Sequence, residues 1–237
     1  ISDPALGPVD PAAGLDADVD RAGDAVVAFI QGTDSDRRLV VAAYDRAPGA
    51  PSGTTTTNWR TTSRPKLAWD AAFDVWSGGM SYQVLLDGQA LATTGATTLQ
   101  SPLPIPDGTH TWQVIATDRR GQVARSATRN LRIDATPPLI AAKITGKRQA
   151  GKPLKIRVTT IDERPPSGSG TKQVRIDFGD RTRTITIAGE AATFPHVFRK
   201  GRFTLRISAR DKAGNASVLR RSIQIKGPKK KKAKKKK

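Results

Sequence analysis

Apolar and polar residues alternate strictly through the segment 202–210. A two-residue period fits a β-strand with one buried face, whereas an amphipathic helix would repeat every 3.6 residues. The apolar set is Phe203, Leu205, Ile207 and Ala209, and the polar set is Arg202, Thr204, Arg206, Ser208 and Arg210. We therefore expect one side of this strand to face a core and the other side to present arginine to solvent.

Short strand-like runs separated by turn residues recur over most of the chain. They are 66–69, 81–86, 89–93, 110–116, 126–133, 156–160 and 174–178. An internal repeat accompanies them, because Gly108, Thr111, Asp118 and Gly121 recur 93 residues later as Gly201, Thr204, Asp211 and Gly214. Short strands at this spacing, repeated over a length typical of one sandwich, predict an all-β protein of tandem immunoglobulin-like β-sandwiches.

The 237 residues divide into four expected regions. Residues 1–50 are expected to form a loose arm over 1–20 and a β-hairpin with strands 25–30 and 38–44. Residues 51–136 and 137–226 are expected to form the two sandwiches, with a flexible linker over 47–57. Residues 227–237 are lysine-rich, cannot bury apolar surface and are expected to be disordered.

Four separated signatures in 137–226 occur in one order. They are Ile176-Asp-Phe-Gly-Asp180, His196 with Phe198, Gly201-Arg-Phe-Thr-Leu, and Asp211-Lys-Ala-Gly-Asn215. This region resembles a PKD domain, the immunoglobulin-like module of the polycystic-kidney-disease type. The resemblance implies structural roles for Asp177, Phe178, Gly179, Asp180, His196, Asp211, Gly214 and Asn215. Three positions depart from the family's pattern, since Ile176 replaces an aromatic residue, Arg181 a glycine and Phe198 a tyrosine.

Two further resemblances concern the first half of the chain. Residues 58–134 resemble the fibronectin-type-III or bacterial immunoglobulin-like modules of secreted proteins, on the residues Trp69, Asp74, Tyr82, Asp87, Asp107, Trp112 and Asp118. The segment Ile133-Asp-Ala-Thr-Pro-Pro138 is similar to the joints between tandem modules of this kind. The hairpin of 25–44 resembles the last part of a β-propeller-type repeat. Because a lone hairpin is marginally stable, we expect it either to pack on the next domain or to be the end of an upstream β domain.

Charge is distributed unevenly along a chain whose net charge is +19. Residues 135–228 carry 20 basic and 6 acidic side chains, and eight lysines follow in 229–237, whereas residues 1–45 have a net charge of −6. The search for an anionic partner therefore belongs to the last third of the chain. Cysteine is absent, which excludes disulfides and thiol chemistry, and no apolar run is long enough to span a membrane.

The sequence offers little for catalysis. The chain has two histidines, His110 and His196, and neither accompanies a nucleophile elbow, a phosphate-binding glycine loop or a metal-binding histidine pair. We therefore predict no enzymatic activity and no cofactor. Calcium is the alternative for Asp162, Glu163 and Asp211, or for Asp134 at the joint, although this ion prefers six or more oxygen ligands and the sequence has no dense acidic loop.

Basic residues provide the candidate binding surface. If the strands near 172–178, 202–210 and 218–226 share a sheet, Arg175 stands near the arginines of the alternating strand. The predicted polyanion-binding set is Arg175, Arg202, Arg206, Arg210, Lys229, Lys230, Lys231, Lys232, Lys234, Lys235, Lys236 and Lys237. A charge-rich strand face also occurs merely to keep sheet edges solvated and unpaired, and both interpretations stay open.

Taken together, these observations predict a monomeric, non-catalytic spacer or interaction module of the cell envelope or the extracellular space. Its expected partners are an anionic envelope polymer, a carbohydrate or a surface protein, and the lysines would attract anionic lipid headgroups without inserting. One alternative is an accessory region of a larger secreted hydrolase. Another is a nucleic-acid-binding protein, which would be non-specific because Phe178 and Phe203 face the core and leave no stacking platform for bases.

Overall fold

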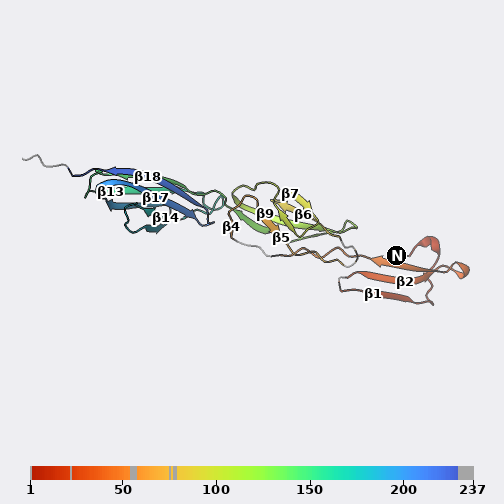
Figure 1. Ribbon diagram of the computed structural model, residues 1–237. Helices are drawn as coiled ribbons and strands as arrows, with labels where there is room; N and C mark the ends of the chain where they lie inside the picture. Colours follow the sequence, from red (N-terminus) through yellow and green to blue (C-terminus); the bar gives the residue numbers. More distant parts are fainter. Residues whose placement is uncertain (1, 22, 54–57, 75, 77–78, 229–237) are drawn as a thin grey trace, which may run out of the picture. The chain divides into compact units, whose positions relative to one another are not determined.

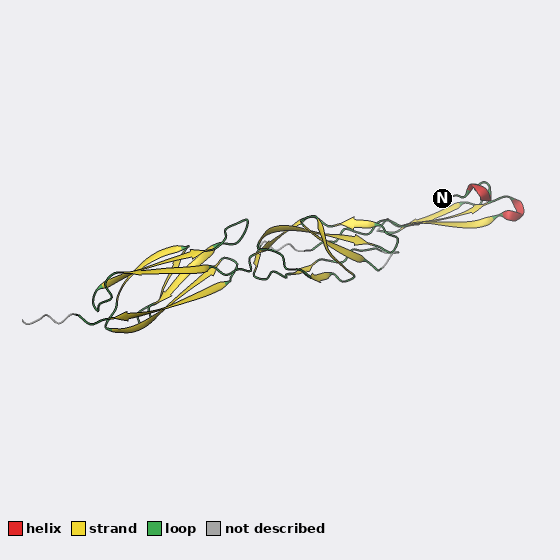
Figure 2. Cartoon of the chain, turned by 90° about the horizontal axis from the view of Figure 1, so that it is seen from above, coloured by secondary structure: helices red, strands yellow, loops and turns green. Residues whose placement is uncertain are grey.

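The computed structural model describes residues 2–21, 23–53, 58–74, 76 and 79–228. Apart from two short 3₁₀ turns, η1 (Pro4–Leu6) and η2 (Asp34–Asp36), the described chain consists of strands and loops (Figure 2). Tandem immunoglobulin-like β-sandwiches, predicted from the sequence, are confirmed. The chain forms two compact units. The first comprises Ile1–Thr55, Lys66–Pro102 and Thr111–Asn130. The second comprises Thr56–Pro65, Leu103–His110 and Leu131–Lys237.

The N-terminal region is a three-stranded antiparallel sheet in the order β1-β2-β3. Its strands are β1 (Leu15–Val19), β2 (Ala25–Gln31) and β3 (Arg38–Tyr44). The predicted hairpin is confirmed as β2 and β3, but the expected loose arm over 1–20 is wrong, because β1 pairs with β2. The side chain of Gln31 also holds the chain before β1, since its Nε2 donates to the carbonyl oxygens of Asp3 (2.6 Å) and Gly7 (2.7 Å).

The first sandwich contains strands β4 to β11. They are β4 (Trp59–Arg60), β5 (Lys66–Ala68), β6 (Ser81–Leu86), β7 (Gln89–Thr94), β8 (Thr98–Gln100), β9 (Gly108–Thr117), β10 (Val123–Arg125) and β11 (Arg129–Ile133). One sheet has the order β4-β11-β9-β6-β7 with β10 on β9, and β5 pairs with β8. The strand predicted over 126–133 begins later, at Arg129. The Ser126 amide still donates to the Val114 carbonyl (2.8 Å), but the Val114 amide donates to Ser126 Oγ (2.9 Å) in place of the backbone carbonyl of Ser126.

The linker predicted over 47–57 is ordered across its described part, residues 47–53. The Gly49 amide donates to the Phe73 carbonyl (2.9 Å), and the Asp70 amide donates to the Ser52 carbonyl (2.7 Å). Pro48 and Pro51 are buried, so apolar rings in a polar-looking segment fix it to the sandwich. The expectation of flexibility is therefore wrong for these residues, and residues 54–57 lie outside the described chain.

The C-terminal sandwich, blue-green to blue in Figure 1, consists of two facing sheets. One sheet has the strand order β12-β13-β16, with β12 (Leu139–Thr145), β13 (Pro153–Ile161) and β16 (Ala191–Val197). The other has the order β15-β14-β17-β18, with β14 (Thr171–Asp177), β15 (Ile185–Ala188), β17 (Gly201–Asp211) and β18 (Ala216–Ile225). The core between them is largely apolar and includes Ile156, Ile176, Phe178, Leu205 and Ile207. The alternation predicted for 202–210 is confirmed, since its apolar set is buried and its arginines are exposed.

The two ends of this sandwich are fixed at opposite ends of β18. Where β18 begins, the hydroxyl of Ser217 donates to the carbonyl oxygen of Pro138, which precedes β12. Just beyond the last residue of β18, Lys226 forms a parallel bridge with Gln149. The chain therefore enters the sandwich beside one end of β18 and leaves it at the other.

The turn after β14 is organised by two aspartates and a histidine. Asp177 Oδ1 accepts from the Gly179 amide (2.8 Å), and Asp180 Oδ1 accepts from the Thr182 amide (3.1 Å). His196 Nε2 donates to Asp180 Oδ2 (2.7 Å), and its ring stacks on Phe178 with the ring centroids 3.8 Å apart. Burial alone would raise the pKa of Asp180, but the hydrogen bonds from His196 and Thr182 outweigh it and lower the pKa.

Arg181 adopts the left-handed backbone conformation, with φ of +68°. This is the position at which the PKD pattern has glycine, so the turn keeps the conformation that glycine favours although the residue is arginine. The preceding residue, Asp180, is held by hydrogen bonds from Thr182, which follows Arg181, and from His196 on β16.

Candidate functional site

An exposed face of the β14-β17-β18 sheet carries the arginines singled out in the sequence. Strand register places Arg206 of β17 directly opposite Asp177 of β14 and Arg220 of β18. The next row on the same face joins Arg175 of β14 to Ser208 of β17. On β14 and β17 the arginines point outward because the alternate residues are buried in the core, and Arg220 of β18 shares their face through its pairing with Arg206. We call the surface formed by Arg175, Arg202, Arg206, Arg210 and Arg220 the basic face.

A hollow of about 130 Å³ lies in the middle of the basic face. Its lining consists of Arg175, Asp177, Arg206 and Ser208. Residues opposite each other or diagonal on adjacent strands lie within reach of long side chains. The hollow therefore brings two guanidinium groups, one hydroxyl and one carboxylate to a single place.

Two more predicted arginines extend the face along β17. Arg202 Nε donates to Gln224 Oε1 on β18 (3.3 Å), and Arg210 lies opposite Gln173 on β14. Both side chains are exposed. The predicted lysines of the set, Lys229 to Lys232 and Lys234 to Lys237, lie outside the described residues.

Arg220 belongs to the basic face but is missing from the predicted set. The segment 218–226 was expected to share this sheet, and the outward set of β18 can be found in it by the same two-residue period: Val218, Arg220, Ser222 and Gln224. The signal is weak because Arg221 follows directly and is also exposed, so the sequence alone does not say which arginine joins the face. The register resolves this, since Arg220 pairs with Arg206 and Arg221 pairs with buried Leu205.

The basic face is poorly neutralised by its own chain. Within the described residues, no carboxylate lies within 4 Å of the charged groups of Arg175, Arg206 or Arg220. Like charges directly opposite on neighbouring strands, as at Arg206 and Arg220, destabilise a sheet. The sandwich therefore carries a small electrostatic cost that an anion on this face would relieve.

A second group of charged residues surrounds the closing turn after β17. Asp211 is fully buried, and its Oδ1 accepts from the amides of Gly214 (2.5 Å) and Asn215 (2.8 Å) while its Oδ2 accepts from Asn215 Nδ2 (2.7 Å). Asp134 is also buried, and its Oδ2 accepts from the Ser169 amide (2.8 Å). These hydrogen bonds close the turn formed by the Asp-x-x-Gly-Asn segment 211–215.

Carboxylate oxygens of Asp134, Asp162 and Asp211 lie within 4.8 Å of one another. Three of the four residues considered for calcium thus meet, whereas Glu163 is exposed and outside the group. Both oxygens of Asp211 and one of Asp134 already accept hydrogen bonds from the protein. Because calcium takes six to eight oxygen ligands, these residues would supply only part of a coordination shell.

Asp162 is the carboxylate most affected by this grouping. Its Oδ2 is buried and accepts no hydrogen bond from the described residues. Burial, and after it the charges of Asp134, Asp211, Glu190 and Glu163, together raise its pKa from 3.8 to about 6. The native protein therefore binds this proton more tightly than the unfolded chain does.

Replacing Asp162 with asparagine is expected to stabilise the protein at pH 8 by on the order of 1 kcal/mol, allowing for solvent screening of a partly exposed group. A raised native pKa means that the free energy of unfolding of the wild type falls as pH rises from about 4 through about 6. The difference between variant and wild type should therefore shrink at pH 4. Urea unfolding followed by circular dichroism, in buffer containing a calcium chelator, measures both values.

The matched control is Glu163→Gln, which removes the same charge from the exposed neighbouring residue. Its effect on stability should be small and nearly independent of pH. Destabilisation of Asp162→Asn at pH 8 would contradict the assignment. Stabilisation of the wild type by added calcium, absent in Asp162→Asn, would instead show that the group binds the ion.

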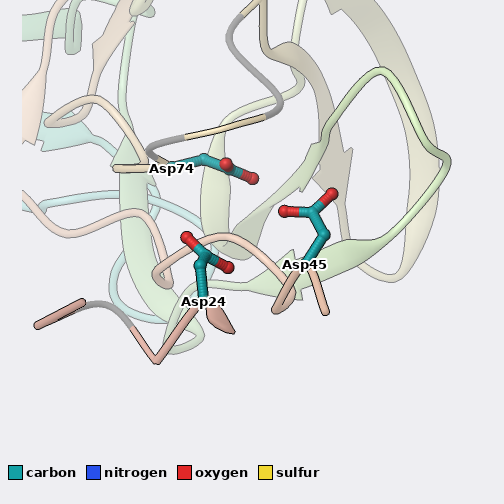
Figure 3. A group of neighbouring side chains, drawn as sticks. All are labelled: Asp24, Asp45 and Asp74. Atoms are coloured by element: carbon teal, nitrogen blue, oxygen red, sulfur yellow. The ribbon is translucent and has the colours of Figure 1, made fainter. Parts of the chain in front are cut away.

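A third aspartate group lies in the other unit. Figure 3 shows Asp24, Asp45 and Asp74 directing their carboxylates toward a common space, and their oxygens lie within 4.8 Å of one another. Asp24 Oδ1 accepts from the Arg46 amide (2.6 Å), and Asp45 pairs with Arg120 (3.1 Å). The sequence does not reveal this group because its members are far apart in the chain and share no motif.

Comparison with known proteins adds a family for the last part of the chain. Residues 139–227 match the bacterial Ig-like domain family. No curated protein matches the sequence. Bacterial Ig-like domains are typically non-catalytic interaction or spacer modules, and they are typical of extracellular and surface proteins. No helix in the described residues has the length and apolarity needed to cross a membrane.

Solved structures with related folds show low identity. The fibronectin(III)-like modules of CbhA from Clostridium thermocellum are 12% identical, with 75% of this chain and 94% of that chain covered and a TM-score of 0.36. A fragment of titin is 12% identical, with 95% and 85% covered and a TM-score of 0.43. The ICAM-5 D1-D4 ectodomain fragment is 16% identical, with 90% and 68% covered and a TM-score of 0.46. The finer resemblances, to a PKD domain and to a propeller repeat, stay predictions.

Proposed function

We propose that the protein is a non-catalytic interaction module of the cell envelope or extracellular space, and that its C-terminal sandwich holds an anionic polymer. The basic face carries this proposal. It presents five arginines on three adjacent strands. Among the described residues of the same face, Asp177 is the only acidic one. A face that served only solubility would intersperse both signs of charge.

The surroundings of the basic face support an electrostatic role. Residues 135–228 contain 20 basic and 6 acidic side chains, so the field of the whole sandwich favours approach of a polyanion. The arginines stand on strands whose other faces are locked in the core, which fixes their spacing before a ligand arrives. Both histidines contribute to structure, since His196 bonds to Asp180 and His110 Nε2 lies 3.0 Å from the carbonyl oxygen of Pro106.

Binding measured across a salt series tests the proposal. The probes are a glycerol-phosphate cell-wall polymer, duplex DNA, a neutral dextran and anionic vesicles. The proteins are the full chain, a chain ending at Gly227, and the full chain carrying Arg175→Gln, Arg206→Gln and Arg220→Gln. The triple variant should bind the cell-wall polymer at least about tenfold more weakly, and its salt slope should be shallower by roughly 2, because each phosphate neutralised contributes about −0.7 to −0.9.

Several outcomes would overturn the proposal. Absence of binding to the cell-wall polymer would remove the function. Binding that is lost with residues 228–237 and unchanged in the triple variant would move the function from the basic face to the lysines. Affinity for duplex DNA well above that for the cell-wall polymer at matched salt would favour a nucleic-acid-binding protein instead.

A further inference from the structure

We propose that the hollow of the basic face is a seat for one phosphate or sulfate group of a hydroxyl-bearing polymer, with Asp177 accepting a hydrogen bond from an adjacent ligand hydroxyl. Arg175, Arg206 and Ser208 would hold the anionic group. This inference rests on the proposed function and names the ligand chemistry of the same face.

Two arginines provide the anion-binding geometry. Arg175 and Arg206 stand on neighbouring strands in adjacent rows, and both line the hollow. A guanidinium group offers planar, paired N–H donors that match the oxygens of phosphate and sulfate. Ser208, in the row of Arg175, adds a hydroxyl donor at the same place. Donors from three side chains thus converge on a space where an anionic group is attracted.

The size of the hollow suits a single group of this kind. Its volume of about 130 Å³ is several times the roughly 10–15 Å³ that one water needs on the same measure. A tetrahedral oxyanion with its linking atoms fits such a space. Neighbouring units of a polymer would continue along β17 toward Arg202 or Arg210, since both lie on the same face.

Asp177 gives the seat its selectivity. Asp177 lines the hollow, and because its Oδ1 accepts from the Gly179 amide, its Oδ2 is the oxygen left to accept from a ligand. A carboxylate beside an anion-binding group repels a second anion and accepts from a hydroxyl group. The seat therefore favours polymers in which charged groups alternate with free hydroxyls, such as sulfated glycans and polyol phosphates. The DNA backbone offers phosphates without such hydroxyls.

Two probes separate this chemistry from general attraction to polyanions. A short dextran sulfate carries sulfate groups together with free hydroxyls, whereas linear polyphosphate carries charge alone. Titration calorimetry on the full chain at one fixed ionic strength gives the ratio of the two affinities. The variants are Asp177→Asn and the double variant Arg175→Gln with Arg206→Gln.

Asp177→Asn is the deciding variant. Asparagine keeps an Oδ1 that can accept from the Gly179 amide, but it replaces the second acceptor oxygen with an N–H donor. The affinity for polyphosphate should rise because a negative charge is lost, while the preference for dextran sulfate over polyphosphate falls about threefold or more, as expected for one lost hydrogen bond. If both affinities rose by the same factor, the face would be a purely electrostatic surface and the seat would be wrong.

The double variant has a matched control on the opposite sheet. Lys143 and Arg157 are exposed, directly paired on β12 and β13, and removed from the basic face. Lys143→Gln with Arg157→Gln removes the same charge and should weaken dextran sulfate binding less than about threefold, against tenfold or more for Arg175→Gln with Arg206→Gln. Equal losses in the two double variants would exclude a localised seat. Such a result would leave the proposed function intact. If the wild type bound neither probe, the proposed function and the seat would both be wrong.

Discussion

Replacing Gly179 with alanine is expected to lower the free energy of unfolding of the C-terminal sandwich by about 3 kcal/mol. Gly179 has φ of +73°, a conformation that costs an L-residue roughly 1 kcal/mol or more. A Cβ there would also overlap the carbonyl oxygen of Thr204 and lie 3.1 Å from the backbone nitrogen and carbonyl carbon of the same residue. That backbone cannot retreat, because Phe203 and Leu205 on either side are buried.

Gly189→Ala is the matched control for this prediction. Gly189 also has positive φ (+93°), but a Cβ at this position would meet no atom within 4 Å. Its substitution should cost only about 1 kcal/mol, the share due to backbone conformation. Urea unfolding gives the total loss, and hydrogen exchange of peptides from β14 and β17 assigns it to this sandwich. Equal losses in the two variants would show that β17 yields to the added methyl group.

Replacing Asp211 with alanine is expected to cost a similar amount, about 3 kcal/mol. Its buried carboxylate accepts three hydrogen bonds from Gly214 and Asn215, and their donors would lose a charged acceptor. Relief of repulsion with Asp134 and Asp162 offsets part of the loss. The same substitution should therefore also flatten the fall in stability between pH 4 and pH 6 that Asp162 causes.

Asp118, the repeat partner of Asp211, provides the comparison. It accepts two amide hydrogen bonds, from Arg120 and Gln122, instead of three. Asp118→Ala should cost about 2 kcal/mol, and hydrogen exchange should locate the loss in the other compact unit. A loss below about 1 kcal/mol for Asp211→Ala would mean that water replaces the carboxylate and satisfies the turn.

Local patterns predicted those parts of the fold that depend on a single strand. The alternation of 202–210 identified both faces of β17, and the Asp-x-x-Gly repeat identified two closing turns. Very short strands such as β4 and β8 carry too few residues to show a period. The strand β1 has a two-residue alternation, but the run is only five residues long and stands in a segment otherwise rich in proline, alanine and glycine, which favoured a loose arm.

The sequence predicted which residues of the candidate site share a face of one strand, but not which residues of different strands meet. Arg175 and Arg206 could be assigned to one face from the sequence, but their common hollow with Asp177 and Ser208 depends on the register between β14 and β17. The partner of Arg206 on β18 likewise depends on register, which is why Arg220 was absent from the set. The grouping of Asp134, Asp162 and Asp211 comes from three separate segments that the fold brings together.

The fixed ends of the C-terminal sandwich determine how it would carry mechanical tension. Pro138 is held beside the start of β18 and Lys226 beside its end, so a pull on the two ends acts along the strands. Seven residue pairs join β12 to β13, and ten join β18 to β17, and they would be loaded in shear together instead of opening one by one. Rupture then requires many hydrogen bonds to fail in a single event. The sandwich should therefore resist a force applied to its two ends.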